Sequence, residues 1–329
     1  MREKKKNLKK MVSNIFVSIC MLMGLTSFAY AEFPEKEIQF IIPFGAGGGA
    51  DIEGRLLAKE MGKILGVPVV AVNKPGGGGA VTYTFTKNAK PDGYTLAWNS
   101  TSILTTTNIG NVPYKHDALD HLGRVEYQPM PLAVRYDAPW KTFKDFAEHC
   151  AKNPRTLKIA NSSAGSATHV ASIAYENAIQ GCKFIHLPVG VKRRNATVLS
   201  GEADGMVGPL TALLNLSKAK KIRLLAIASD NRNSVIPNVP TAGELGYKAN
   251  LDLFRGLSVP KGTPANVKAK LTEAMIQAAK SDAFSGLAKK KGFTVDPLTG
   301  NEFDRMISME DTVVRDIMVS AGLYQSKKK

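Results

Sequence analysis

The sequence predicts an α/β fold in which mainly parallel β-sheet is flanked by helices. Short apolar runs alternate with longer helical patterns along almost the whole chain of 329 residues, which is typical of βαβ units. Glycine-rich or polar segments follow several of these runs directly, where open α/β sheets bind their ligands. The strands are expected at residues 39–44, 67–73, 94–99, 131–136, 157–161, 183–189, 205–208, 222–229 and 251–259.

The N-terminal segment has the composition of a secretory signal peptide. Six basic residues lie among the first ten, an apolar run follows, and the run closes on Ala29-Tyr30-Ala31. A basic start, an apolar core and an A-x-A ending are features of a cleaved export signal. We therefore expect residues 1–31 to be removed and the protein to work in the periplasm or another extracytoplasmic compartment. A retained membrane anchor is one alternative, and a lipoprotein acylated at Cys20 is another, although Ile19 fits that motif poorly.

Composition narrows the function further. The formal net charge is +16, and +11 remains without residues 1–31, because 38 basic and 27 acidic residues are left. A positive balance favours anionic ligands through the long-range field but is also compatible with simple solubility, and the aromatic and basic interleaving of nucleic-acid binders is missing. Beyond residue 31 no apolar run is long enough to cross a bilayer. After removal of the signal peptide, Cys150 and Cys182 remain. They could form one disulfide or stay as two buried thiols, and the sequence leaves both open.

Several helix ends are marked by capping residues. Thr142 precedes a helical pattern with Asp145 three positions later, and Thr263-Pro264 places proline at a first helical position. The pairs Thr241–Glu244 and Thr299–Glu302 fit capping boxes. Residues 81–86 are ambiguous, because apolar residues alternate there with threonines as in a strand, whereas the preceding glycines suit a helix start.

The first glycine-rich loop, Gly45 to Asp51, follows the first strand and raises the question of a nucleotide phosphate. The next strand ends in Val72-Asn73-Lys74 and lacks the acidic residue of a dinucleotide site. No Walker A lysine and no G-x-S-x-G elbow occur, and the five histidines show no metal-ligand spacing. We therefore expect no catalytic residue, no metal and no cofactor. A secreted α/β enzyme acting on a carboxylate or phosphate ester is the alternative.

A second glycine-rich loop, Asn73 to Ala80, also follows a strand directly. Polar loops at residues 99–102 and 161–169 follow two further strands. Backbone N–H groups and hydroxyls gathered at strand ends can bind a carboxylate, but they supply no nucleophile with an obvious base. The pattern indicates binding of an organic anion.

Nine motifs then occur in a fixed order between residues 33 and 323: "PFGAGGGAD", "GVPVVAVNKPGGGG", "PDGYTL", "SAGSATHVA", "LSGEAD", "IRLLAIAS", "IPNVPTAGELGY", "LSVPKGTP" and "SAGL". In these motifs the chain resembles the extracytoplasmic receptors of the tripartite tricarboxylate transporter family. The resemblance implies a two-lobed fold like that of periplasmic binding proteins. Residues 32–129 and 254–329 would form lobe 1, residues 130–253 lobe 2, and the strands at 131–136 and 251–259 the hinge. It also implies a helix after Gly79.

The resemblance implies a receptor, not an enzyme. Such a receptor captures a small organic anion, which could be a mono-, di- or tricarboxylate or an aromatic acid, and delivers it to membrane transporter subunits. It would act as a monomer, without nucleic acid or cofactor. A sensory receptor for the same ligand is the alternative that the sequence leaves open.

The resemblance also implies the site residues. The two glycine loops would hold a ligand carboxylate through Gly47, Gly48, Gly49, Ala50, Asp51, Gly77, Gly78, Gly79 and Ala80. Asp51 is expected to cap the helix and order its loop. Lobe 2 would contribute Ser163, Gly165, Ser166, Thr168, His169, Gly190 and Asp204, and Ser100 and Phe254 complete the set. His169 could instead be a packed helix residue, and Phe254 a core residue of the hinge strand.

The chain departs from the family pattern in one region. Relatives often carry a tyrosine and a lysine where this chain has Pro188-Val189-Gly190, one residue shorter, and Lys192-Arg193-Arg194 follows directly. The basic turn could be a solvated surface. Alternatively, one arginine pairs with a second ligand carboxylate, and we assign that role to Arg193. Thr82 also stands where relatives often have glycine.

Overall fold

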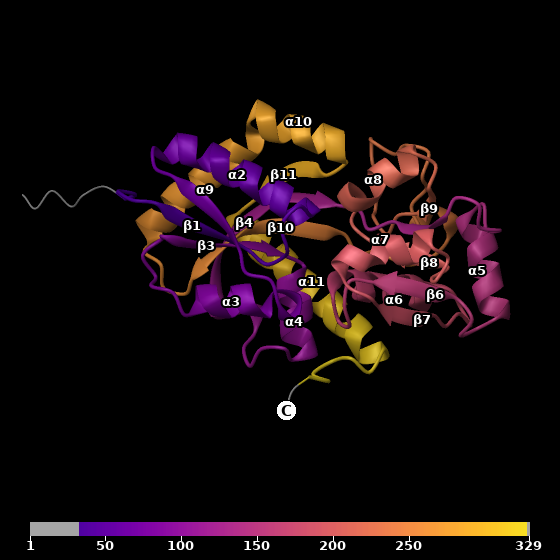
Figure 1. The fold of residues 1–329 in the computed structure, drawn as a ribbon. Helices are drawn as coiled ribbons and strands as arrows, with labels where there is room; N and C mark the ends of the chain where they lie inside the picture. The colour runs from indigo at the N-terminus through magenta and orange to yellow at the C-terminus, as the bar shows by residue number, and fades with distance from the viewer. Residues whose placement is uncertain (1–32, 328–329) are drawn as a thin grey trace, which may run out of the picture. The chain divides into compact units, whose positions relative to one another are not determined.

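Two mixed β-sheets, each flanked by helices, organise the chain from Lys36 onward (Figure 1). The computed structural model describes residues 33–327, so the signal peptide expected over residues 1–31 lies outside the described residues. The first sheet has the order β11 (Thr294–Leu298), β4 (Leu119–Gln128), β10 (Leu253–Pro260), β3 (Thr95–Ser100), β1 (Ile38–Ile42), β2 (Val69–Asn73). The second has the order β7 (Ile185–Pro188), β6 (Lys158–Asn161), β8 (Gly205–Val207), β5 (Leu132–Arg135), β9 (Ile222–Ala226).

Strand direction differs within each sheet. β1 runs parallel to β2 and β3, and β6 runs parallel to β7 and β8. The other pairs are antiparallel, because β10 opposes β3 and β4, β11 opposes β4, and β5 opposes β8 and β9. Parallel pairs need a crossover connection, which a helix supplies here. The parallel part of each sheet is therefore its βαβ part, and the loops that follow these strands leave it at one edge.

The chain passes between the sheets twice. Residues 129–131 connect β4 of the first sheet to β5 of the second, and residues 227–252 lead from β9 back to β10. The first sheet consequently takes its strands from both the beginning and the end of the described chain (Figure 1). The predicted α/β class and two-lobed architecture are confirmed, while the residue limits of the lobes stay a prediction.

Helices cover both sheets, and the C-terminal helix contacts helices on both. Those of the first lobe are α2 (Gly49–Leu65), α3 (Ala80–Lys87), α4 (Ser102–Ile109), α9 (Ala265–Lys280), α10 (Asp282–Lys291) and α11 (Gly300–Ser320). Those of the second are α5 (Phe143–Lys152), α6 (Ala167–Ala178), α7 (Val191–Leu199) and α8 (Leu210–Lys218). Short 3₁₀ turns occupy Gly77–Gly79, His116–Ala118 and Gly243–Leu245. The C-terminal helix α11 packs against α4 of one lobe and α6 of the other.

The ambiguous segment after Gly79 is the helix α3, as the resemblance implied and against its local strand period. The capping boxes at Thr142 and Thr241 are both formed. The one predicted at Thr299 is wrong, because its side chain makes no capping bond and Gly300 begins α11 with φ +59°. Pro264 is the N-cap of α9, one position earlier than predicted.

Cys150 and Cys182 form a disulfide, which resolves the two alternatives of the sequence. The bridge joins the end of α5 to the segment before β7, with the two Cα atoms 4.9 Å apart. It lies in the core of the second lobe, where the tilted rings of Phe146 and Phe184 have their centroids 5.8 Å apart.

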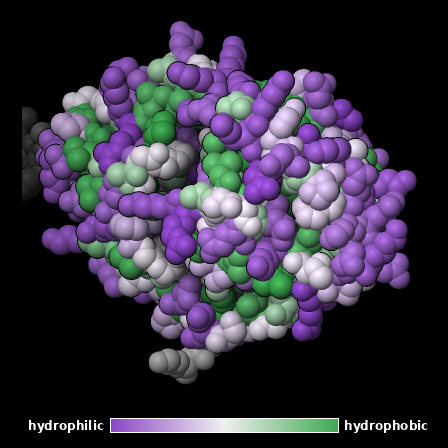
Figure 2. All heavy atoms as spheres, turned by 45° about the vertical axis from the view of Figure 1, so that its right-hand side comes forward, coloured by the Kyte–Doolittle hydropathy of each residue, from purple (hydrophilic) through white to green (hydrophobic). Residues whose placement is uncertain are grey.

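The surface is mostly polar. Hydrophilic side chains cover most of the face shown in Figure 2, with apolar patches between them and a hollow left of its centre. Across residues 33–327, no helix is long and apolar enough to span a membrane.

Candidate functional site

The first glycine loop joins β1 to α2, and Asp51 fixes its conformation. Asp51 Oδ2 accepts a hydrogen bond from the Gly47 N–H at 2.9 Å, and Oδ1 accepts from Arg55 and Asn73, each at 2.8 Å. Burial alone would raise the pKa of the Asp51 carboxyl, but these donors hold it below its usual value. Asp51 therefore orders the loop as predicted, although the N-cap position is occupied by Gly48.

The N-terminus of α2 presents backbone without a side chain at Gly48, beside this ordered loop. The first N–H groups of a helix have no acceptor within the helix, and they carry partial positive charge. Gly48 is half-buried, and a Cβ at this position would have only the Gly45 carbonyl oxygen nearby, at 3.6 Å. Gly47 has φ +82°, which favours glycine. An anion can therefore approach the helix end without meeting a side chain of the loop.

The second glycine loop joins β2 to α3 and is held by α4 and the residues after it. Thr106 Oγ1 donates to the Gly78 carbonyl at 2.8 Å, and Asn111 Nδ2 donates to the Gly77 carbonyl at 3.1 Å. Gly77, Gly78 and Gly79 all have positive φ. A sequence of three such residues needs glycine at each position, so this loop presents backbone rather than side chains.

The two glycine loops leave the first sheet side by side. Ile42 and Asn73, the last residues of β1 and β2, are register partners, and the Lys74 N–H donates to the Ile42 carbonyl at 2.9 Å. Thr82, which replaces a family glycine, is buried and donates to the Lys74 carbonyl at 2.8 Å. The departure at Thr82 thus supports the second loop from behind.

Two close approaches place the second sheet opposite these loops. A Cβ on Gly49 would lie 2.7 Å from Oγ1 of Thr211 in the first turn of α8. A Cβ on Gly165 would overlap the side chain of Ile109 at the end of α4. Gly165 and Thr211 belong to the segments that follow β6 and β8. The carboxyl ends of parallel strands from both lobes therefore face each other, and this is the candidate site.

The loop after β6 is held by its own hydrogen bonds. His169 Nδ1 accepts from the Gly165 N–H at 3.0 Å, and Thr168 Oγ1 accepts from the Ser162 N–H at 3.0 Å. Burial, and then the neighbouring His186, lower the pKa of His169 to about 4. The imidazole is therefore neutral and serves as an acceptor that shapes the loop.

The two predicted serines lie in the same loop. Ser166 is the N-cap of α6, where its hydroxyl oxygen accepts from the His169 N–H at 3.3 Å and donates to the Ser163 carbonyl at 2.8 Å. Ser163 is half-buried. Gly190, with φ +93°, precedes α7 at the carboxyl end of β7 and has open space around it.

Three predicted residues make their contacts within the protein. The Ser100 hydroxyl is buried against Ser102 Oγ at 2.8 Å, and Phe254 packs in the core against Phe303. Asp204 accepts from the Lys158 N–H at 2.8 Å, at the amino end of β6. Asp204 directly precedes β8, which runs parallel to β6. It therefore lies at the amino ends of these strands, on the opposite side of the second sheet from the loops of the candidate site. All three side chains are thus engaged within the protein, and a ligand contact by any of them stays a prediction.

The basic turn directs Arg194, not Arg193, into the protein. The Arg193 side chain is exposed and lies 3.9 Å from Glu202. The Arg194 side chain is buried, and its Nη1 donates to Ser162 Oγ at 3.1 Å. Sequence reasoning singled out the triplet and gave the inward role to Arg193, whereas the structure buries Arg194. Arg194, Thr197 and Val198 are buried at helical spacing, and that period is the signal that would have identified it.

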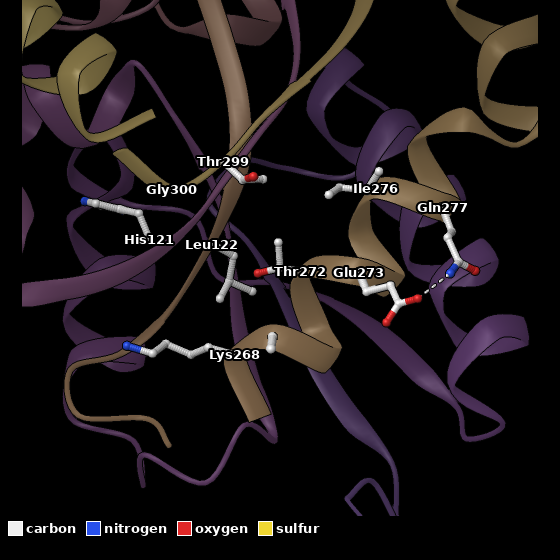
Figure 3. Close-up of a pocket in the computed structure, with 10 residues that line it drawn as sticks. His121, Leu122, Lys268, Thr272, Glu273, Ile276, Gln277, Thr299 and Gly300 are labelled. Atoms are coloured by element: carbon white, nitrogen blue, oxygen red, sulfur yellow. Dashed lines mark hydrogen bonds between the residues drawn. The ribbon is translucent and has the colours of Figure 1, made fainter. Parts of the chain in front are cut away.

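A separate cavity of about 500 Å³ lies between α9, β4 and the start of α11 (Figure 3). Its two basic side chains, Lys268 and His121, carry no free positive charge. Lys268 Nζ lies 2.9 Å from Asp120 Oδ2, and burial, followed by the adjacent His116, lowers the pKa of His121 to about 3. The cavity therefore offers an anion no uncompensated positive charge. None of the predicted site residues lines it.

The residues that the structure describes contain no group of three metal-ligating side chains. Two α/β lobes joined by two crossings, with strand-end loops facing each other, define a two-lobed solute-binding protein. A family model described as "Tripartite tricarboxylate transporter family receptor" matches residues 54–322. The chain belongs to this family.

Relatives agree with that assignment. A UPF0065 protein of Cupriavidus necator is 33% identical over 251 residues, which cover 75% of this chain and 76% of the relative. A solved periplasmic transporter structure, 29% identical, gives a TM-score of 0.82 over 89% of this chain and 99% of its own. The structure of MatC from Rhodopseudomonas palustris with bound malate is 25% identical and gives a TM-score of 0.77. The match covers 87% of this chain and 99% of MatC.

Proposed function

We propose that this protein captures a small organic carboxylate between its lobes and delivers it to a membrane transporter of the tripartite tricarboxylate type, without catalysis. The observation that carries the proposal is the opposition of the two glycine loops to the strand-end loops of the second lobe, marked by the approach of Gly49 to Thr211. Membership of the receptor family supports it, as does the malate bound to the related MatC.

The chemistry of the loops agrees with a carboxylate ligand. Backbone N–H groups and a helix N-terminus stabilise an anion with partial charges and fixed geometry. Asp51 is the carboxylate nearest to this end of α2 in sequence, and Arg55 and Asn73 already engage it. Its charge is therefore compensated within the protein and repels an incoming anion little.

Binding is tested with the variant Gly48→Val. Gly48 has φ −80° and ψ 170°, which valine adopts without strain, so the variant should keep its fold while its side chain covers the end of α2. We expect calorimetry of the wild type to give one-to-one binding of a carboxylate, weakened at least tenfold by Gly48→Val. Gly286→Val, at an exposed helical glycine with open space, is the matched control and should bind as the wild type does.

The panel for this test contains organic acids, amino acids, NAD and sugar phosphates. A response restricted to nucleotides or phosphate esters, or consumption of the added compound, would replace the receptor by the enzyme alternative. We further propose export to the periplasm through cleavage after Ala31. N-terminal sequencing of the exported protein should then begin at Glu32, and a retained N-terminus would contradict this part of the proposal.

A further inference from the structure

Arg194 is a buried cation without an acidic partner among the residues that the structure describes. Only 2% of the residue is exposed. Its one hydrogen bond goes to the neutral Ser162 hydroxyl, and its Nε has no partner. Among residues 33–327 no Asp or Glu forms an ion pair with it. Burial lowers the pKa of Arg194 only to about 10, so the guanidinium stays protonated at neutral pH.

The other buried arginine of the described chain shows what is unusual here. Arg255 is 3% exposed, and its Nε lies 2.5 Å from Glu53 Oε2 and 3.2 Å from Glu126 Oε1. A buried charge is costly unless an opposite charge and hydrogen bonds compensate it. Arg255 receives the opposite charge from two carboxylates within the chain, although its Nε and Nη1 make no hydrogen bond of ordinary geometry. For Arg194 the described part of the chain provides only the Ser162 hydroxyl.

The position of Arg194 relates it to the candidate site. Ser162 directly follows β6, and the guanidinium lies so close to Gly208, directly after β8, that a Cβ there would be 2.7 Å from Cζ. Three residues beyond Gly208 is Thr211, whose Oγ1 is buried without a partner and faces Gly49. The guanidinium thus lies at the edge of the second sheet that opposes the glycine loops.

We propose that Arg194 binds a second anionic group of the ligand, so that this receptor selects dicarboxylates over monocarboxylates. The inference rests on the proposed function, in which the glycine loops hold the first carboxylate. The planar guanidinium can donate two parallel hydrogen bonds to one carboxylate, which a lysine ammonium cannot. Arg193 is excluded from this role by its exposure and its proximity to Glu202.

Calorimetry with length-matched acids tests the proposal. The probes are succinate against butanoate, glutarate against pentanoate, and adipate against hexanoate. We expect the wild type to bind at least one dicarboxylate about a hundredfold or more tightly than its partner acid. Arg194→Met should weaken that dicarboxylate at least thirtyfold, since a buried charge contact is lost, while changing the affinity for the monocarboxylate less than about threefold. Arg193→Met is the matched control and should leave both affinities unchanged.

The stability of the ligand-free protein separates a binding role from a structural one. A buried charge without a partner can be replaced by an apolar side chain of similar size without loss of stability. Arg194→Met should therefore melt at or above the temperature of the wild type. Arg194→Lys, which keeps the charge but loses the paired donors, gives a second variant whose dicarboxylate preference should be intermediate.

The outcomes are distinguishable. A wild type that binds monocarboxylates as tightly as their dicarboxylate partners, or dicarboxylate affinities unchanged in Arg194→Met and Arg194→Lys, would overturn the role of Arg194 and leave the carboxylate receptor in place. Failure of the wild type to bind any of the organic acids would overturn both the proposed function and this inference.

Discussion

Replacement of Arg255 should test how the glycine-loop helix is anchored. The side chain lies in β10 and pairs with Glu53 of α2 and Glu126 of β4, and all three residues are at most 3% exposed. The cluster therefore ties the helix that begins at the first glycine loop to the two strands next to the lobe crossings. Arg255→Met removes the cation and leaves two carboxylates in the interior.

The size of the effect follows from charge burial. Breaking a buried ion pair from one side costs roughly 3–5 kcal/mol, because an uncompensated charge remains. Burial, and then the charge of Glu53, already raise the pKa of Glu126 well above its usual value, and removal of Arg255 raises it further. When an acid has a raised pKa in the folded state, the protein loses stability as pH rises, because the unfolded chain releases that proton at a lower pH. Without Arg255 the folded chain holds the carboxyl groups of Glu53 and Glu126 in its interior with no cation beside them, whereas the unfolded chain ionises both above their ordinary pKa values. The loss of stability in Arg255→Met should therefore grow between pH 5 and pH 8.

Urea unfolding followed by circular dichroism at pH 5, 6, 7 and 8 measures this deficit. Glu126→Gln is the informative control, because an acid with a strongly raised pKa resembles its amide. We expect Glu126→Gln to cost less than half as much free energy of unfolding as Arg255→Met at pH 8. A loss below about 1 kcal/mol for Arg255→Met, well under the cost of breaking a buried pair, or a loss independent of pH, would refute the reasoning.

Three further perturbations have defined outcomes. Replacing Cys150 and Cys182 by serine opens a bridge spanning 32 positions and should lower the free energy of unfolding by about 3–4 kcal/mol on the loop-entropy scale, measured by urea unfolding; a loss below about 1 kcal/mol would contradict it. Burial raises the pKa of Glu310 to about 8. Glu310→Gln should therefore match the stability of the wild type at pH 4 and exceed it by roughly 3–5 kcal/mol at pH 8. Equal urea unfolding curves at both pH values would show that this carboxyl is not perturbed. Gly49→Ala places a methyl group 2.7 Å from the Thr211 hydroxyl and should weaken ligand binding about tenfold through overpacking, and Thr211→Ala in the same chain should restore it in calorimetry; no recovery would place the effect elsewhere.

The fold was largely predictable because most strands are apolar and sharply bounded. The two strands that sequence reasoning missed, β4 and β11, are those whose patterns are interrupted by charge or proline. In β4, Arg124 and Glu126 disguise a buried strand, and Glu126 is tolerated there only because Arg255 arrives from a strand much later in the chain. β11 contains Asp296 and Pro297 at the edge of the sheet. Such long-range compensation cannot be read from local periodicity.

The candidate site was predictable where backbone chemistry decides it. Glycines after strands indicated both loops, and the structure adds that Asp51 orders the first. Side-chain roles were less accessible, because they depend on how elements rotate and pair. The rotation of α7 buries Arg194 and exposes Arg193. The pairing of β6 with β8 places Asp204 at the far edge.

The two lobes offer a ligand chemically different partners, and this difference predicts when they close. The glycine loops of the first lobe supply backbone donors, whereas Arg194 of the second supplies a full charge. A ligand shifts a conformational equilibrium only by its different affinities for the two states. A monocarboxylate satisfied by one lobe gains little from closure, while a dicarboxylate spanning both lobes gains the second contact only when they approach.

Small-angle X-ray scattering can measure this coupling. If Arg194 binds a second carboxylate, saturating adipate should decrease the radius of gyration of the wild type, and saturating hexanoate should leave it nearly unchanged. Arg194→Met should bind adipate without a decrease in the radius of gyration, whereas Arg193→Met should behave as the wild type. Equal compaction by both acids would mean that the first carboxylate alone drives closure, and the division of roles between the lobes would then be wrong.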